Sequence, residues 1–241
     1  MPQETFTVPR TETEVAVVWG RSRLPSDIGA ELIELLATEP EMVVCDLTGM
    51  AALPQVVDVF APVASYLSAW PGTVVAACVP DPAARDRLRT HPATSQVVVT
   101  ATMDEAMTAA RRSIRPVQRA HLRMLPLPAS AHHARAFAAD TLHSWNLSTM
   151  ASTVQLVVSE LVTNAILHAH TVVDLSLSRI GQRVRVGVHD RAGGRPTVQS
   201  VDPFAYPLGG QGLLLAQEHA DCWGVLRTQT VGKTVWAVLT R

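Results

Sequence analysis

Apolar residues in the first half of the chain fall into two alternating patterns. Short, nearly continuous apolar runs predict buried strands at residues 14–19, 42–47, 73–79 and 96–100. Helically spaced apolar positions predict helices at residues 27–36, 56–69, 83–89 and 103–110. Ser26 or Asp27 is available to cap the first helix. This alternation of strands and helices predicts an α/β layered fold.

The second half groups its helices and strands differently. The pattern predicts a strand at 121–127, helices at 131–145 and 149–168, and strands at 172–180 and 183–189 joined by a Gly181-Gln182 turn. Residues 191–211 are rich in glycine and proline and have little periodicity, which is typical of a lid or a binding loop. A helix at 213–220 and strands at 222–228 and 234–240 follow.

Between residues 110 and 128 the composition of the sequence changes. Prolines stand at 116, 126 and 128, and five arginines punctuate the stretch: Arg111, Arg112, Arg115, Arg119 and Arg123. We interpret the stretch as a solvated helix face and a linker, the alternative being a contact with phosphate or a partner. The sequence therefore predicts two α/β domains, at residues 1–117 and 118–241.

Composition and charge narrow the classes of function. The 241 residues are 47% hydrophobic and 17% charged, which suits a chain with a buried core. The formal net charge is −1, so the balance gives no indication of nucleic acid or an anionic membrane as a direct partner. Residues 1–120 hold 14 acidic and 10 basic residues, whereas residues 121–241 hold 7 and 10. The modest basic excess of the second half, which includes the only lysine, Lys233, suits a polyphosphate.

Cysteines and apolar segments point to an ordinary reducing compartment. Cys45, Cys78 and Cys222 show no CxxC spacing, which favours buried free thiols over a zinc or redox motif. The first residues lack the apolar core of a signal peptide, and no run of apolar residues approaches the length that spans a bilayer. We therefore expect a cytoplasmic protein with no membrane partner.

Four local features carry candidate chemistry, and each has an ordinary alternative when taken alone. Glu160, Asn164 and His168 fall on one face of the helix at 149–168, where an amphipathic helix with a wet side would look the same. Asp190 ends a predicted strand and could accept a hydrogen bond from an exocyclic amine, or could be a turn aspartate.

The other two features are glycine-containing turns. Gly209, Gly210 and Gly212 precede an apolar helix that begins at Leu213, an arrangement that can cradle phosphates on backbone N–H groups. The signatures GxxxxGK[ST] and GxGxxG are both absent. Near the end of the sequence, Gly232 opens a turn that leads through Lys233 and Thr234 into the last strand.

In this order and spacing, the four features resemble the GHKL ATPase superfamily. SELVTNAILHA resembles its N box, VHDRAGG its G1 region and GGQGLLLA its G2 box, over residues 121–241. The resemblance is strongest to the small anti-sigma-factor serine kinases, and it implies the α/β sandwich known as the Bergerat fold. One departure concerns the DxGxG pattern of G1, in which Ala192 replaces the first glycine while Asp190 and Gly194 match.

The resemblance implies a role for each matched residue with ATP and Mg²⁺ as cofactors. Asn164 would hold Mg²⁺ through its amide oxygen, and Glu160 would be the general base. Asp190 would accept a hydrogen bond from the adenine amino group, with Thr234 beside Asp190. The remaining expected nucleotide contacts are Gly194, Gly209, Gly210, Gly212 and Leu213. Residues 195–208 would form the lid, and His168 would serve in packing or in the outer shell.

Residues 12–112 resemble, more weakly, a STAS domain, the fold of anti-sigma-factor antagonists. VVCDLTGM, at residues 43–50, matches the strand and turn before the regulatory serine of that family. The corresponding stretch here, residues 52–57, contains no hydroxyl, so the resemblance implies a degenerate domain retained for docking, dimerisation or sensing. The alternative is a generic α/β domain that shares only this turn.

The two resemblances together leave two functions open. The first is a serine/threonine kinase that phosphorylates an antagonist protein and controls the availability of a sigma factor, with a homodimer as one candidate assembly. The second is a non-catalytic ATP-binding switch that uses the N-terminal domain for docking or sensing. A histidine kinase is disfavoured because the sequence offers no transmembrane sensor and no separate long helix with a phosphoacceptor histidine.

Overall fold

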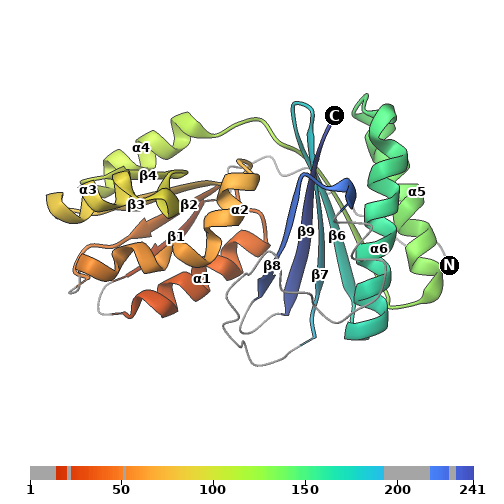
Figure 1. Cartoon of the computed structure of the whole chain (residues 1–241), viewed down its shortest axis with the longest axis horizontal. Helices are drawn as coiled ribbons and strands as arrows, with labels where there is room; N and C mark the ends of the chain where they lie inside the picture. The colour runs from red at the N-terminus through yellow and green to blue at the C-terminus, as the bar shows by residue number, and fades with distance from the viewer. Residues whose placement is uncertain (1–14, 21–22, 51–52, 193–217, 228–231) are drawn as a thin grey trace. The chain divides into compact units, whose positions relative to one another are not determined.

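The computed structural model describes residues 15–20, 23–50, 53–192, 218–227 and 232–241. The chain divides into two compact units, and the division falls between Pro116 and Val117. The sequence predicted a boundary between residues 117 and 118. Each unit has its own sheet, parallel in the first and antiparallel in the second, so the predicted α/β class is confirmed (Figure 1).

A four-stranded parallel sheet forms the centre of the first unit. Its strands lie in chain order, β1 (Val15–Trp19), β2 (Met42–Asp46), β3 (Val74–Cys78) and β4 (Val97–Thr100). The inner strands β2 and β3 are buried almost throughout, because a parallel sheet is covered on both faces. This burial explains why their sequences are continuously apolar rather than alternating. It also raises the pKa of the Cys45 thiol to about 12, as expected for an inert core cysteine.

Helices cover this sheet: α1 (Pro25–Ala37), α2 (Ala64–Ala69), α3 (Pro82–Thr90) and α4 (Met103–Ser113). Ala106 and Ala110 of α4 pack on Met42 and Ala76 of the sheet. Helix α4 begins with a capping box, in which the Thr102 hydroxyl accepts from the Glu105 N–H and the Glu105 carboxylate accepts from the Thr102 N–H.

Two local predictions in this unit are wrong. Helix α1 starts two residues earlier than a Ser26 cap would allow: its N-cap is Leu24, Pro25 lies in the first turn, and no side chain caps it. The helix predicted at 56–69 is not continuous. It consists of two 3₁₀ segments, Leu53–Val59 and Ala61–Val63, followed by α2. Pro62 has no N–H to donate and its ring obstructs an α-helix, which accounts for the break.

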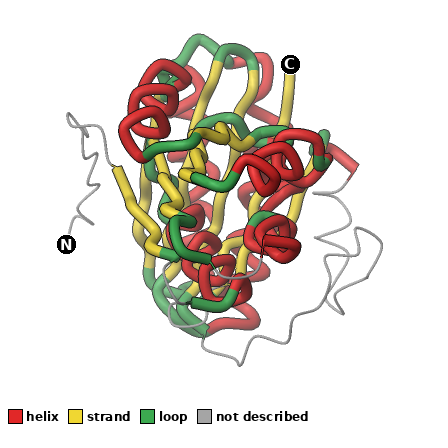
Figure 2. Tube along the Cα trace, turned by 90° about the vertical axis from the view of Figure 1, so that its left-hand side faces the viewer, coloured by secondary structure: helices red, strands yellow, loops and turns green. Residues whose placement is uncertain are grey.

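A five-stranded antiparallel sheet forms the second unit, and the strand order is β5-β6-β7-β9-β8. The strands are β5 (Gln118–Met124), β6 (Val173–Ile180), β7 (Arg183–Asp190), β8 (Cys222–Arg227) and β9 (Lys233–Thr240). Strands are yellow and helices red in Figure 2. The predicted β6–β7 hairpin is confirmed, with Gly181 at a positive φ of 58° in its turn. Of the helix predicted at 213–220, only residues 218–220 lie within the described part of the chain.

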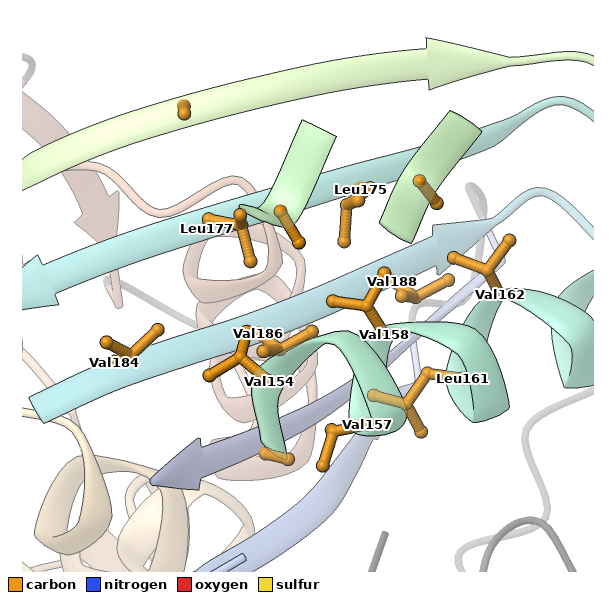
Figure 3. Packing of buried hydrophobic residues seen from close by; sticks show 14 of the residues in the cluster. Val154, Val157, Val158, Leu161, Val162, Leu175, Leu177, Val184, Val186 and Val188 are labelled. Carbon is orange, nitrogen blue, oxygen red and sulfur yellow. The ribbon is translucent and has the colours of Figure 1, made fainter. Parts of the chain in front are cut away.

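Helices α5 (Pro128–Ser144) and α6 (Ala151–Ala169) pack on one face of this antiparallel sheet (Figure 1). Figure 3 shows the valines of α6 against those of β7, with Val158 and Val162 beside Val188. Each fully buried valine or leucine in this layer contributes about 1.5–3 kcal/mol of transfer free energy. The packing fixes the rotation of α6 about its axis, and therefore also fixes which of its side chains face away from the core.

The sequence predicted no apolar segment long enough to span a bilayer, but helix α6 is an exception by length and composition. With the 3₁₀ turn before it, Ser148–Ala169 is long and apolar enough, by length and composition only, to cross a membrane. Its apolar side chains are those of a core helix, however, since Val154, Val157, Val158, Leu161 and Val162 are buried against the sheet. The same helix carries the polar residues that matter for the candidate site.

Candidate functional site

Helix α6 carries polar side chains on both sides of its buried face. Contacts with α5 show which of the two sides faces that helix. Ser159 accepts a hydrogen bond of 2.9 Å from the Arg135 guanidinium of α5, and Gln155 donates one of 3.2 Å to the Arg135 carbonyl. At about 100° per residue, Glu160 and Asn164 lie one turn apart on the flank turned away from α5. Both side chains are half-buried, whereas His168, which continues the stripe, is exposed.

Asp190 lies on the same side of the sheet as α6. It is the last residue of β7, in which Val184, Val186 and Val188 point into the core beneath the helices. Because side chains alternate along a strand, Asp190 points the same way. It pairs with Val173, the first residue of β6, and β6 follows the end of α6 after only three residues. The end of α6 and the carboxylate of Asp190 therefore lie at the same end of the sheet.

The Asp190 carboxylate is almost fully enclosed, with 1% of the side chain exposed. Its Oδ1 accepts a hydrogen bond of 3.2 Å from the N–H of Ala192, and its Oδ2 lies 3.5 Å from Nζ of Lys233. A buried carboxylate is costly unless it is paired and hydrogen-bonded, and these two contacts offset that cost. The N–H of Ala192 thus supports Asp190, although alanine replaces the first glycine of the expected G1 pattern.

The structure corrects the predicted neighbour of Asp190. Thr234 was expected beside it, but Thr234 is opposite His189, and its hydroxyl lies 3.1 Å from the His189 Nδ1 on the other face of the sheet. The residue opposite Asp190 is Lys233. The expectation for Thr234 came from the family resemblance, and adjacent residues of a strand point to opposite faces of the sheet. Residues 234–239 of β9 are all buried and nearly all apolar, so the sequence of this strand carries no alternation that would have identified Lys233.

Gly232 allows the chain to enter β9 close to the end of β7. Its φ is +110°, and a Cβ atom added there would lie 1.9 Å from the carbonyl oxygen of Asp190. No side chain fits in that space, and no L-residue adopts that φ without strain. The glycine is therefore part of the construction that holds Asp190 and Lys233 side by side.

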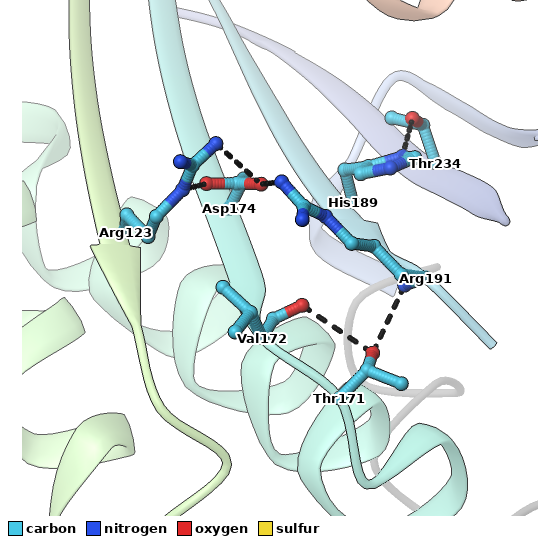
Figure 4. A network of polar contacts seen from close by, with 7 residues as sticks. All are labelled: Arg123, Thr171, Val172, Asp174, His189, Arg191 and Thr234. Atoms are coloured by element: carbon cyan, nitrogen blue, oxygen red, sulfur yellow. Dashed lines mark hydrogen bonds and ion pairs between the residues drawn. The ribbon is translucent and has the colours of Figure 1, made fainter. Parts of the chain in front are cut away.

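A second polar network fixes the residue that follows Asp190 (Figure 4). The N–H of Arg191 donates to the Thr171 hydroxyl at 2.9 Å, and its guanidinium lies 3.7 Å from the Asp174 carboxylate. Asp174 also accepts two hydrogen bonds from Arg123, at 2.6 and 3.3 Å, which raise the pKa of that guanidinium. Arg191, the residue after β7, is thus hydrogen-bonded to the turn before β6 and connected through Asp174 to Arg123 of β5.

Five of the predicted nucleotide-binding residues lie outside the described part of the chain: Gly194, Gly209, Gly210, Gly212 and Leu213. The proposed lid at 195–208 also lies outside it. Of the described candidates, Glu160, Asn164 and Asp190 share one side of the sheet. Their chemical roles remain predictions.

The donor set on α6 suits Mg²⁺ held jointly with a substrate. Among the described residues, no group of three or more His, Cys, Asp and Glu side chains is arranged to hold a metal ion by itself. Asn164 offers an amide oxygen, and Mg²⁺ prefers oxygen ligands. It is usually bound through one or two protein ligands while phosphates and waters complete the shell. The residues therefore fit a Mg²⁺ ion that arrives with a polyphosphate.

One comparison with known proteins bears on this part of the chain. No curated protein matches the sequence. Residues 124–239 match the family model described as a histidine kinase-like ATPase domain. The matched region begins at the end of β5 and extends to the last residues of β9, so it includes Glu160, Asn164, Asp190 and Lys233. The match supports a GHKL-like ATPase domain in the C-terminal unit.

Proposed function

We propose that the C-terminal unit binds Mg·ATP and that the protein is a regulatory serine/threonine kinase of the anti-sigma-factor type. Its substrate would be a hydroxyl of an antagonist protein with a STAS fold, and its effect would be to control a sigma factor. The observation that carries the proposal is the location of Glu160, Asn164 and Asp190 on the same side of the sheet, within a unit that matches ATPase domains.

Each of these residues has a distinct task in the proposed reaction. Asp190 accepts a hydrogen bond from the adenine amino group, while Asn164 holds the metal-bound phosphates near α6. Bound Mg²⁺ would neutralise negative charge on the phosphates. Glu160 takes the proton of the attacking hydroxyl as its oxygen bonds to the γ-phosphorus and the bond to the β–γ bridging oxygen breaks, releasing ADP. Phosphoryl transfer depends mainly on such positioning, which these residues supply.

The proposal assigns a docking role to the N-terminal unit. Support comes from the turn after β2, in which Asp46 Oδ1 accepts a 2.9 Å hydrogen bond from the Thr48 N–H and Gly49 has a φ of +81°. This compact turn is the DLTG segment, residues 46–49, whose sequence resembles STAS domains. The segment after it, Leu53–Val59, is a 3₁₀ helix without a hydroxyl-bearing side chain, so phosphorylation at the usual position is not expected.

A non-catalytic ATP-dependent switch is the second candidate. Ala192, where the G1 pattern has glycine, favours it, because the turn after Asp190 then differs from that of the catalytic relatives. In this case the unit would bind nucleotide and change a partner surface without transferring phosphate.

The deciding experiment combines binding with turnover on the full chain. Calorimetry with ATP and ADP, with and without Mg²⁺, is followed by a transfer assay with a candidate antagonist protein and γ-labelled ATP. We expect N164A to lose Mg·ATP binding, and E160A to keep binding but lose phosphoryl transfer. Unchanged Mg·ATP affinity in N164A would refute the role of Asn164. Binding without transfer in the wild type would favour the switch.

A further inference from the structure

We propose that Lys233 is a specificity-determining residue that reads the nucleobase together with Asp190. Asp190 accepts a hydrogen bond from the amino group of adenine. The Lys233 ammonium group donates a hydrogen bond to a ring nitrogen next to that amino group. This inference rests on the proposed nucleotide site and adds to it the way in which adenine is recognised.

The first support is the placement of the two side chains. Lys233 and Asp190 are direct partners in the β7–β9 pair, at the end of the sheet where α6 ends. Lys233 shares its face of β9 with Val235 and Ala237, so its side chain extends toward the side of the sheet that carries α6. With 26% of its side chain exposed against 1% for Asp190, Lys233 is the more accessible member of the pair.

The second support is the chemistry of the pair. Asp190 offers an acceptor and Lys233 a donor, 3.5 Å apart. Adenine has the complementary arrangement, since its amino group is a donor with ring nitrogens on both sides, N1 and N7, that accept. An ammonium group has three N–H donors, so Lys233 can keep its contact with Asp190 while it donates to the base.

The third support is the charge that the site must retain. If a neutral amino group displaced Lys233 from Asp190, a carboxylate with 1% exposure would lose its nearby cation, which is costly. The base therefore binds beside the ion pair rather than in place of it. Thr234, which was expected here, cannot take this part because its hydroxyl is on the opposite face with His189.

The test pairs a protein variant with a change in the ligand. Calorimetry measures the affinity of wild type and K233M for ATP, 1-deaza-ATP and 7-deaza-ATP, each of which lacks one of the two ring nitrogens. We expect the wild type to bind one deaza analogue about tenfold more weakly than ATP. We expect K233M to bind ATP about tenfold more weakly than the wild type and to lose that discrimination.

Matched variants separate this effect from charge and from folding. R183M removes a cation from the other end of the same sheet and should leave ATP affinity unchanged within about twofold. Gln in K233Q keeps an N–H donor, so this variant should retain part of the discrimination. Thermal unfolding followed by circular dichroism identifies any variant that fails to fold. If K233M is unstable, the affinities of K233Q for ATP and the deaza analogues are compared with those of the wild type instead.

A second measurement uses the single lysine of the chain. Acylation of Lys233, followed by mass spectrometry, should slow when ATP is bound, because the base covers the ammonium group. Faster acylation with ATP would mean that the nucleotide displaces Lys233, and would overturn the inference. Equal loss for a deaza analogue in wild type and K233M would overturn it as well, while leaving ATP binding intact. If folded wild type binds no ATP at all, the proposed function fails together with this inference.

Discussion

At the scale of single residues, the candidate site depends on a backbone position that holds no chemistry of its own. Gly232 lies against the carbonyl of Asp190, and its positive φ directs Lys233 into the register opposite Asp190. The acidic and basic partners are therefore close because a glycine precedes them. A search for chemically reactive side chains would not select this residue.

We expect G232A to destabilise the C-terminal unit by roughly 2–4 kcal/mol, because the new Cβ would overlap the Asp190 carbonyl and the backbone would be strained. Urea unfolding of the full chain, followed by tryptophan fluorescence and circular dichroism, measures the change. G181A is the matched control, since Gly181 also has a positive φ but has nothing within 4 Å of its added Cβ, and should cost only about 1 kcal/mol. Equal costs in the two variants would contradict the steric argument.

At the scale of elements, the sequence predicted most strands and helices because burial leaves a clear periodicity. The β6–β7 hairpin and helices α5 and α6 follow their apolar patterns within a few residues. The failures have local causes that periodicity does not report. Pro62 divides an apolar stretch that otherwise has helical spacing. Pro25 lies in the first turn of α1, which therefore begins before both predicted caps.

The candidate site shows the same division between what periodicity reports and what it does not. Glu160 and Asn164 could be assigned to one helix face from spacing alone, whereas the neighbour of Asp190 depended on the strand register. Register is fixed by pairing between segments that are distant in sequence, so the sequence could not show that Lys233, rather than Thr234, pairs with Asp190.

Helix capping gives a prediction at this scale. T102A should lower the stability of the N-terminal unit by about 1 kcal/mol, because it removes the acceptor for the Glu105 N–H in the capping box of α4. S26A in α1 should have an effect within about 0.5 kcal/mol, since Ser26 is exposed and α1 has no side-chain cap. Chemical unfolding of both variants provides the test, and a larger loss in S26A would restore the original prediction of a cap at that residue.

At the scale of the whole molecule, the chain joins two units with separate sheets and separate cores. The proposed function gives them different tasks, nucleotide binding in residues 117–241 and docking in residues 15–116. A ligand that binds only the native state stabilises it by about 2.7 kcal/mol when its concentration is ~100 times its Kd. Since the proposed contacts lie on one unit, that stabilisation should be concentrated there.

Hydrogen exchange of the full chain with and without saturating Mg·ATP tests this division. We expect amides of α6, β7 and β9 to exchange more slowly with nucleotide, by up to about 100-fold where exchange requires opening of the C-terminal unit. N164A should show no such change at the same nucleotide concentration. If the amides of β2 and β3 also slow in the wild type, nucleotide binding is coupled to the N-terminal unit, as a partner switch requires. Uniform exchange with and without Mg·ATP would count against nucleotide binding itself, because ligand binding to the native state necessarily lowers the population of the opened states.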